Sequence, residues 1–181
     1  MTLPNLITLF RLLLVPLTIW LMLTGEFAAA FWVFCAAGIS DGIDGFIARH
    51  FNLRTQLGAF LDPVADKALL VSVFVILGLV AALPAWLVVL VVARDVMILG
   101  GFVLLHLLGE APEVRPLIVS KLNTAAQIAL AACMLVRLGF AVALGPVQPA
   151  LIYGVALTTA VSGAAYLVQW SRLVGGKGTT R

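Results

Sequence analysis

The sequence predicts an all-α integral membrane protein with six transmembrane helices. Of its 181 residues, 63% are hydrophobic and only 10% are charged, which is far outside the range of a soluble domain. Long stretches without Asp, Glu, Lys or Arg run from Ala68 to Ala93 and from Leu138 to Ser171. Each stretch is long enough to cross a bilayer at least once. Composition and uninterrupted apolar length therefore predict the fold class.

Glycine, proline and charged residues divide the chain into six segments with helical length. The predicted helices are residues 6–24, 27–48, 58–82, 85–108, 118–137 and 148–172. The sequence shows no internal repeat and no separate soluble domain, so we expect one transmembrane domain over residues 1–181. No basic side chain precedes the first apolar run and no small-residue cleavage site follows it, which favours retention of the first helix. Cys35 and Cys133 lie in apolar segments and are expected to be small buried hydrophobes.

The basic residues predict the orientation in the membrane. The first, third and fifth connections would lie on one side, which carries only Arg137. The other side and the C-terminal tail carry six basic residues, namely Arg49, Arg54, Arg115, Arg172, Lys177 and Arg181. By the positive-inside rule, both termini are expected in the cytoplasm. The expected location is a bacterial inner membrane, and the net charge of +3 favours anionic lipid headgroups over nucleic acid.

Four aspartates gather in the stretch "SDGIDGFIARHFNLRTQLGAFLDPVADK", residues 40–67. Asp41 and Asp44 are three residues apart near the end of one predicted helix, and Asp62 and Asp66 are four apart near the start of the next. Each pair therefore projects from one face of its helix, and the two helix ends are neighbours. An unpaired carboxylate at the bilayer centre costs about 2.5 to 3.5 kcal/mol, so these acids need compensation.

A divalent cation would supply that compensation. The donor set contains only oxygen, with no His or Cys beside it, which favours Mg²⁺ or Mn²⁺ over zinc. Four carboxylates could hold two such ions, and metals held in this way commonly engage substrate phosphates. The small residues Gly42, Gly45 and Ala48 leave room for a ligand beside the acids, and Arg49 adds a cation suited to phosphate.

Residues 41–66 read D-x-x-D-G-x-x-A-R-x8-G-x3-D-x3-D, which resembles the signature of the CDP-alcohol phosphatidyltransferase family at every position. The chain also resembles six-helix members of that family in length and number of helices. The resemblance implies that an alcohol hydroxyl attacks the phosphorus of a CDP-linked lipid and that CMP is released. It further implies a homodimer acting on CDP-diacylglycerol and an alcohol acceptor.

The resemblance also implies roles for individual residues. The four signature aspartates would be the ligands of a binuclear Mg²⁺ or Mn²⁺ site, and Asp66 would in addition be the general base. The CDP pocket would be lined by Asn5, Gly45, Ala48, Arg49 and Gly58.

The acceptor is less clearly encoded. The segments "LPAWLVVLVVARDVMILGG" and "RPLIVSKLNTAAQIALAA" resemble those of eukaryotic-type cardiolipin synthases, which use phosphatidylglycerol. Phosphatidylglycerophosphate synthases, which use glycerol 3-phosphate, share the Arg–acid pair and are the alternative. Both acceptors carry a phosphate, and Arg94 and Lys121 are candidates for binding it. Because adjacent residues point about 100° apart on a helix, we expect Arg94 and Asp95 to have separate partners.

Two other functions would also use acids within a membrane. An ion or proton carrier is one, but no inverted repeat is visible and the acids lie on one side of the membrane. An intramembrane prenyltransferase is the other. Such enzymes usually have two separated acidic motifs, whereas this chain has one contiguous motif. A purely structural set of ion pairs with Arg49, Arg54 and Lys67 is the remaining explanation of the aspartates.

Overall fold

The computed structural model describes the backbone of residues 3–50, 56–107 and 118–175, and the side chains of residues 10, 12–40, 67–101 and 118–169. These residues form six α-helices and no β-strand. The helices are α1 (Leu3–Leu23), α2 (Phe27–His50), α3 (Gln56–Leu79), α4 (Ala85–Leu107), α5 (Ile118–Gly139) and α6 (Val147–Gly175). Every boundary lies within three residues of the predicted one, so the predicted helix order is confirmed.

The hydropathy of the helices agrees with an integral membrane protein. Within the described part of the chain, Ile118–Gly139 and Val147–Gln169 are long and apolar enough to cross a membrane. Shorter apolar helical segments cover Leu12–Leu23, Phe27–Ser40 and Lys67–Leu79. Crossing by all six helices, and the cytoplasmic position of both termini, stay predictions.

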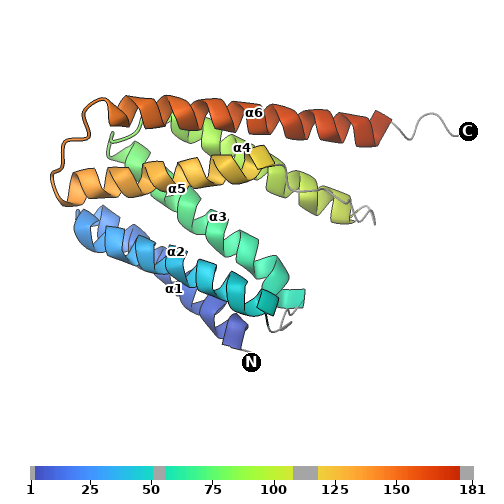
Figure 1. Ribbon diagram of the computed structural model, residues 1–181, viewed down its shortest axis with the longest axis horizontal. Helices are drawn as coiled ribbons and strands as arrows, with labels where there is room; N and C mark the ends of the chain where they lie inside the picture. Colours follow the sequence, from blue (N-terminus) through green and yellow to red (C-terminus); the bar gives the residue numbers. More distant parts are fainter. Residues whose placement is uncertain (1–2, 51–55, 108–117, 176–181) are drawn as a thin grey trace, which may run out of the picture.

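The helices pack in two groups that share an apolar core. Helix α1 packs against α2 and α3, while α6 packs against α4 and α5, and contacts between α2 and α5 join the groups (Figure 1). Among the described residues, α4 contacts α3 and α6 rather than α5. Phe74 and Leu77 on α3 and Leu130 and Met134 on α5 are fully buried. Close packing of such side chains holds helices together where the surrounding lipid is equally apolar.

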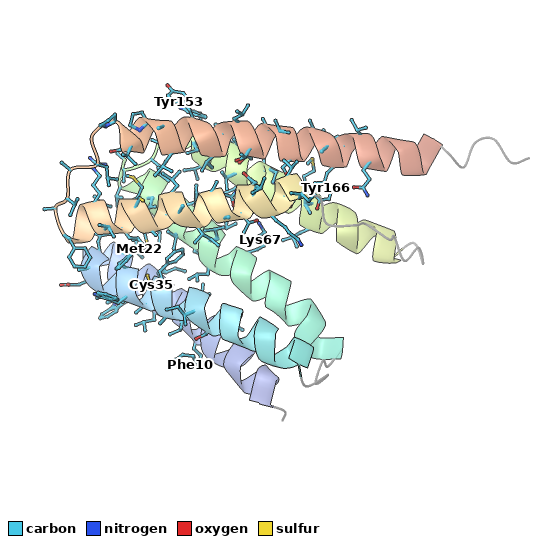
Figure 2. The ribbon with its side chains drawn as sticks, in the orientation of Figure 1. Phe10, Met22, Cys35, Lys67, Tyr153 and Tyr166 are labelled. Carbon is cyan, nitrogen blue, oxygen red and sulfur yellow. The ribbon has the colours of Figure 1, made fainter. Side chains whose placement is uncertain are left out.

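The outer surface is apolar as well. Trp20, Trp32 and Leu79 are among the large hydrophobic side chains that are mostly exposed. Phe10 on α1 and Tyr153 on α6 project outward from opposite sides of the bundle, whereas Lys67 lies between helices (Figure 2). A surface of this kind suits contact with lipid. Cys35 and Cys133 are free thiols that are only partly buried, so the expectation of full burial is wrong.

Three connections gather at one end of the molecule, between α1 and α2, α3 and α4, and α5 and α6 (Figure 1). Gly25 (φ 83°) closes the first, and Ala81 takes the same left-handed conformation (φ 55°) in the second. At the third, a Cβ on Gly139 would lie 2.5 Å from the Ala28 backbone nitrogen. Glycine is therefore required where the end of α5 meets the start of α2.

Candidate active site

The signature aspartates lie on the two helices that the sequence predicts. Helix α2 carries Asp41 and Asp44, and α3 carries Asp62 and Asp66. The end of α2 and the start of α3 lie at the same end of the molecule, opposite the other three connections (Figure 1). The side chains of all four acids lie outside the described residues. Their grouping around metal therefore stays a prediction, and no cluster of three potential metal ligands occurs in the described part.

The predicted CDP-binding residues are likewise on helices. Asn5 lies on α1, Gly45, Ala48 and Arg49 lie on α2, and Gly58 lies on α3. Their surroundings are outside the described part of the chain, so their roles stay predictions. On α3, the described side chains begin at Lys67, directly after Asp66.

Lys67 begins a buried network of charged side chains. Its Nζ donates a hydrogen bond to Asp95 Oδ2 on α4 at 2.8 Å. The other carboxylate oxygen, Oδ1, accepts a hydrogen bond from Arg94 Nη1 at 2.7 Å. The side chain of Asp95 is only 1% exposed and that of Arg94 only 4%. One buried carboxylate therefore holds two cations, one from α3 and one from its own helix.

The expectation that Arg94 and Asp95 have separate partners is wrong. The arginine side chain is long enough to curve back across the angle between adjacent helix positions, and its guanidinium reaches Asp95 directly. Arg94 has further partners, because Nη2 donates to Ser120 Oγ on α5 at 2.6 Å and to Ser162 Oγ on α6 at 2.5 Å. Its guanidinium also lies 5.9 Å from the centre of the Tyr166 ring.

Arg94 is thus a link between helices. It bridges α4 to α5, two helices that do not pack directly against each other in the described part of the chain. Its Nε is buried and has no hydrogen-bond partner among the described residues. A role in binding the acceptor phosphate stays a prediction, and in this arrangement both terminal nitrogens already have protein partners.

A second polar group lies between α5 and α6. Asn123 Oδ1 accepts hydrogen bonds from Thr158 Oγ1 at 2.9 Å and Thr159 Oγ1 at 2.8 Å. Gln127, one turn further along α5, is fully buried, and neither its oxygen nor its nitrogen has a partner among the described residues. Buried polar groups of this kind are costly and are often found at functional sites.

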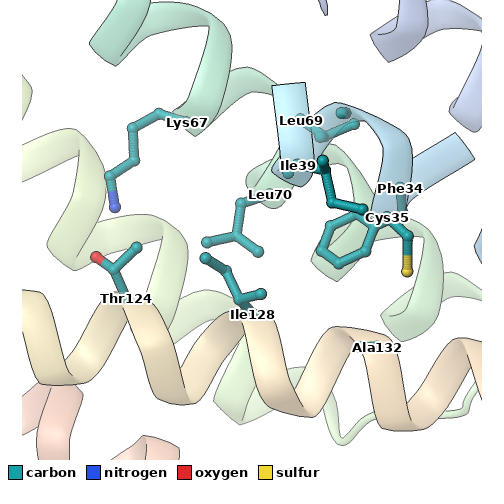
Figure 3. Close-up of a pocket in the computed structure, with 11 residues that line it drawn as sticks. Phe34, Cys35, Ile39, Lys67, Leu69, Leu70, Thr124, Ile128 and Ala132 are labelled. Atoms are coloured by element: carbon teal, nitrogen blue, oxygen red, sulfur yellow. The ribbon is translucent and has the colours of Figure 1, made fainter. Parts of the chain in front are cut away.

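A pocket of about 420 Å³ lies beside the charged network. It is lined from α2, α3 and α5, and most of the lining is apolar. Lys67 and Thr124 lie at one end, Leu70 and Ile128 lie in the middle, and Phe34 lies toward the other end (Figure 3). The remaining lining residues are Cys35, Ala37, Gly38, Ile39, Leu69 and Ala132. The pocket therefore has one polar end and an apolar body, which suits an amphipathic ligand.

Lys121 lies on the helix face that continues this lining. Thr124, Ile128 and Ala132 line the pocket from α5, and Lys121 precedes Thr124 by three residues on the same face. Its side chain is exposed, in contrast to the buried Arg94. The structure thus separates the two predicted phosphate-binding residues, since Arg94 is buried among α4, α5 and α6 and Lys121 lies at the surface of α5.

Comparison with known proteins identifies the family. The CDP-alcohol phosphatidyltransferase family model matches residues 1–167. The chain belongs to this family. The match covers the signature aspartates, the pocket and the Lys67–Asp95–Arg94 network, so the resemblance seen in the sequence is confirmed.

Individual relatives include two kinds of enzyme. The probable cardiolipin synthase (CMP-forming) of Drosophila melanogaster is 33% identical over 93% of this chain and 58% of its own length. The human cardiolipin synthase (CMP-forming) is 33% identical over 91% of this chain and 60% of its own length. The CDP-diacylglycerol–glycerol-3-phosphate 3-phosphatidyltransferase of Escherichia coli K12 is 37% identical over 74% of this chain and 76% of its own length. The chain thus spans about three-fifths of these cardiolipin synthases.

Sequence reasoning did not assign a site role to Lys67, Asp95, Ser120 or Ser162. A signal was present, because polar and charged side chains are rare within apolar helices and usually have a defined partner. Their spacing along the chain did not reveal which of them meet. Lys67 and Asp95 are 28 residues apart, and Arg94 and Ser162 are 68 apart.

Proposed function

We propose that this protein transfers a phosphatidyl group from CDP-diacylglycerol to phosphatidylglycerol, forming cardiolipin and releasing CMP. One observation carries the proposal: an apolar pocket is shared by α2, α3 and α5, and the signature aspartates follow its lining residues on α2 and precede them on α3. A nucleotide-lipid needs both parts, since its diphosphate requires metal or cationic groups and its acyl chains require an apolar surface. Membership of the family supports the same reaction.

The chemistry of the donor set fits a divalent cation. Asp41, Asp44, Asp62 and Asp66 offer only carboxylate oxygens, which are the ligands that Mg²⁺ and Mn²⁺ prefer. When bound, two such ions would neutralise charge on the diphosphate and on the departing CMP. The protein's own residues would orient the reactants, with Arg49 contributing a further cation toward phosphate.

In the proposed reaction, the acceptor hydroxyl oxygen forms a bond to the lipid-linked phosphorus while the phosphorus–oxygen bond to CMP breaks. The hydroxyl proton moves to the Asp66 carboxylate, which acts as the general base. CMP leaves with its phosphate group, and a phosphodiester remains on the lipid. No redox step or additional co-reactant is needed.

The alternative acceptor is glycerol 3-phosphate, and a specific observation supports it. The Escherichia coli relative whose name specifies glycerol 3-phosphate is 37% identical, slightly more than the cardiolipin synthases, although over a shorter part of the chain. Arg94 and Lys121 suit either acceptor, since both acceptors carry phosphate. We favour phosphatidylglycerol because the similarity to cardiolipin synthases extends over more than nine-tenths of this chain.

The proposal includes a setting in the membrane. All six helices would cross a bacterial inner membrane, with both termini and the aspartates on the cytoplasmic side. Basic residues near the predicted cytoplasmic connections support this orientation. Two copies would form a homodimer, as the family resemblance implies.

An acceptor assay tests the proposed function. Purified protein in detergent with Mg²⁺ or Mn²⁺ and CDP-diacylglycerol receives either phosphatidylglycerol or glycerol 3-phosphate, and CMP and the lipid product are measured by mass spectrometry. We expect cardiolipin from phosphatidylglycerol, and we expect Asp66→Asn to be folded and inactive. Product from glycerol 3-phosphate alone would overturn the acceptor, and wild-type turnover by Asp66→Asn would remove the general base.

A further inference from the structure

Lys67 joins the charged network to the apolar pocket. Its ammonium donates to Asp95 at 2.8 Å, and its side chain also lines the polar end of the pocket beside Thr124 (Figure 3). Its side chain is 22% exposed, compared with 1% for Asp95. Of the three charged side chains in the network, Lys67 is therefore the one that a ligand in the pocket could reach.

The charges of this network do not balance. Asp95 supplies one negative charge, while Lys67 and Arg94 supply two positive charges. Arg94 alone is sufficient to balance Asp95, since its Nη1 lies 2.7 Å from Oδ1 in a fully buried position. Among the described residues the network thus carries one surplus positive charge, and Lys67 holds it at the pocket.

A surplus cation beside an apolar pocket is costly without an anionic partner, because little water is available to solvate it. The four signature aspartates lie nearby in the sequence, but two divalent cations would balance their charges in the proposed site. The anion that matches both Lys67 and the adjoining pocket is a phosphate attached to a long apolar chain.

We propose that Lys67 binds the phosphate of a glycerophospholipid whose acyl chain occupies the pocket, and that Asp95 positions the lysine for this contact. This inference rests on the proposed function and adds a binding residue to it. Thr124 lies at the same polar end. Its hydroxyl donates to the Ser120 carbonyl oxygen at 3.2 Å and would have to rotate away from it to donate to a phosphate or ester oxygen. The phospholipid is either CDP-diacylglycerol or phosphatidylglycerol, which share this chemistry.

A binding measurement without turnover tests the contact. Protein in detergent with EDTA is heated with CDP-diacylglycerol, phosphatidylglycerol or diacylglycerol, and the melting temperature is recorded. We expect wild type to be stabilised more by the two phospholipids than by diacylglycerol, which has no phosphate. Lys67→Gln should lose this difference for the lipid that Lys67 binds, and Lys67→Arg should keep it. Arg137→Gln, at the far end of α5, is the matched control and should behave like wild type.

Steady-state kinetics identify which of the two phospholipids Lys67 binds. A charge-assisted hydrogen bond contributes enough that its loss should raise KM by roughly tenfold or more. We expect Lys67→Gln to raise KM for either CDP-diacylglycerol or the acceptor, with the other value nearly unchanged. Because Arg94 still balances Asp95, the variant should melt close to wild type without lipid.

Each result of the binding and kinetic experiments either supports or overturns the proposed contact of Lys67 with phosphate. A purely structural lysine would give a lower melting temperature with unchanged KM values and an unchanged preference for phospholipid, and this result would overturn the proposal. Misfolding of both Lys67→Gln and the length-matched Lys67→Met would overturn it as well, because the charge argument would then be wrong. If wild type binds phospholipid but releases no CMP from any acceptor, the proposed function fails while the lipid contact stands.

Discussion

Buried polar residues are the most informative features of this protein at the residue scale. Asp95 accepts hydrogen bonds from two cations, and Arg94 connects α4 to α5 through Ser120 and to α6 through Ser162. Gln127 differs from them, because it is equally buried but has no hydrogen-bond partner among the described residues. The first group stabilises the arrangement of helices, whereas Gln127 carries a desolvation cost that nothing described offsets.

That cost leads to a prediction for Gln127. Replacement by leucine, which has a similar volume, removes two unpaired polar atoms from the interior. We expect Gln127→Leu to raise stability by about 1 to 3 kcal/mol, the usual cost of an unsatisfied buried group. Thermal denaturation in detergent measures the change.

Asn123→Leu is the matched control. Its Nδ2 has no partner among the described residues, but its oxygen accepts two threonine hydroxyls, so we expect this variant to be less stable than wild type. A lower melting temperature for Gln127→Leu would mean that Gln127 has a stabilising partner.

At the scale of the elements, short side chains decide how closely helices approach. Gly139 ends α5 against the start of α2, and a Cβ there would overlap the Ala28 nitrogen at 2.5 Å. The overlap involves backbone, which cannot rotate away as a side chain could. In contrast, a Cβ on Gly154, in the first half of α6, would have no neighbour within 4 Å among the described residues. Close packing of α5 against α2 therefore requires glycine at position 139, whereas packing does not require glycine at position 154.

We predict opposite effects of alanine at these positions. Gly139→Ala should destabilise the protein by about 1 to 3 kcal/mol, since it forces α5 away from α2. Gly154→Ala should raise stability by about 0.5 to 1 kcal/mol, because alanine favours a helix interior over glycine. Melting temperatures of the two variants measured side by side provide the check. Equal tolerance at both sites would contradict the close approach.

At the scale of the whole molecule, the centre of the apolar core and the signature aspartates lie on different parts of the helices. Phe74, Leu77, Leu130 and Met134 are buried in the described bundle, whereas the signature aspartates are at the end of α2 and the start of α3. The pocket belongs partly to the core, because its lining residues Phe34, Ala37, Leu69 and Leu70 are also core residues. Stability of the bundle therefore depends mainly on packing, and the proposed activity depends on groups at one end.

This separation predicts different responses to metal removal. EDTA should abolish CMP release, while the helical circular dichroism signal persists because the packed core contains no proposed metal ligand. Addition of excess Mg²⁺ or Mn²⁺ should restore release. Turnover that continues in EDTA would contradict the metal site, and a parallel loss of helical signal would show that the ions also hold the fold.

The sequence by itself determined the helices, their order and the family. Helix boundaries were predictable because apolar length and the positions of glycine, proline and charge depend on neighbouring residues, and the signature in residues 41–66 is contiguous along the chain. Only the tertiary structure decided that Asp95 holds both Lys67 and Arg94, and that α2, α3 and α5 enclose a pocket with Lys67 at its polar end. These features join residues far apart in sequence. These contacts depend on the angles at which the helices cross and on the conformations of the long side chains. The local periodicity of the sequence specifies neither.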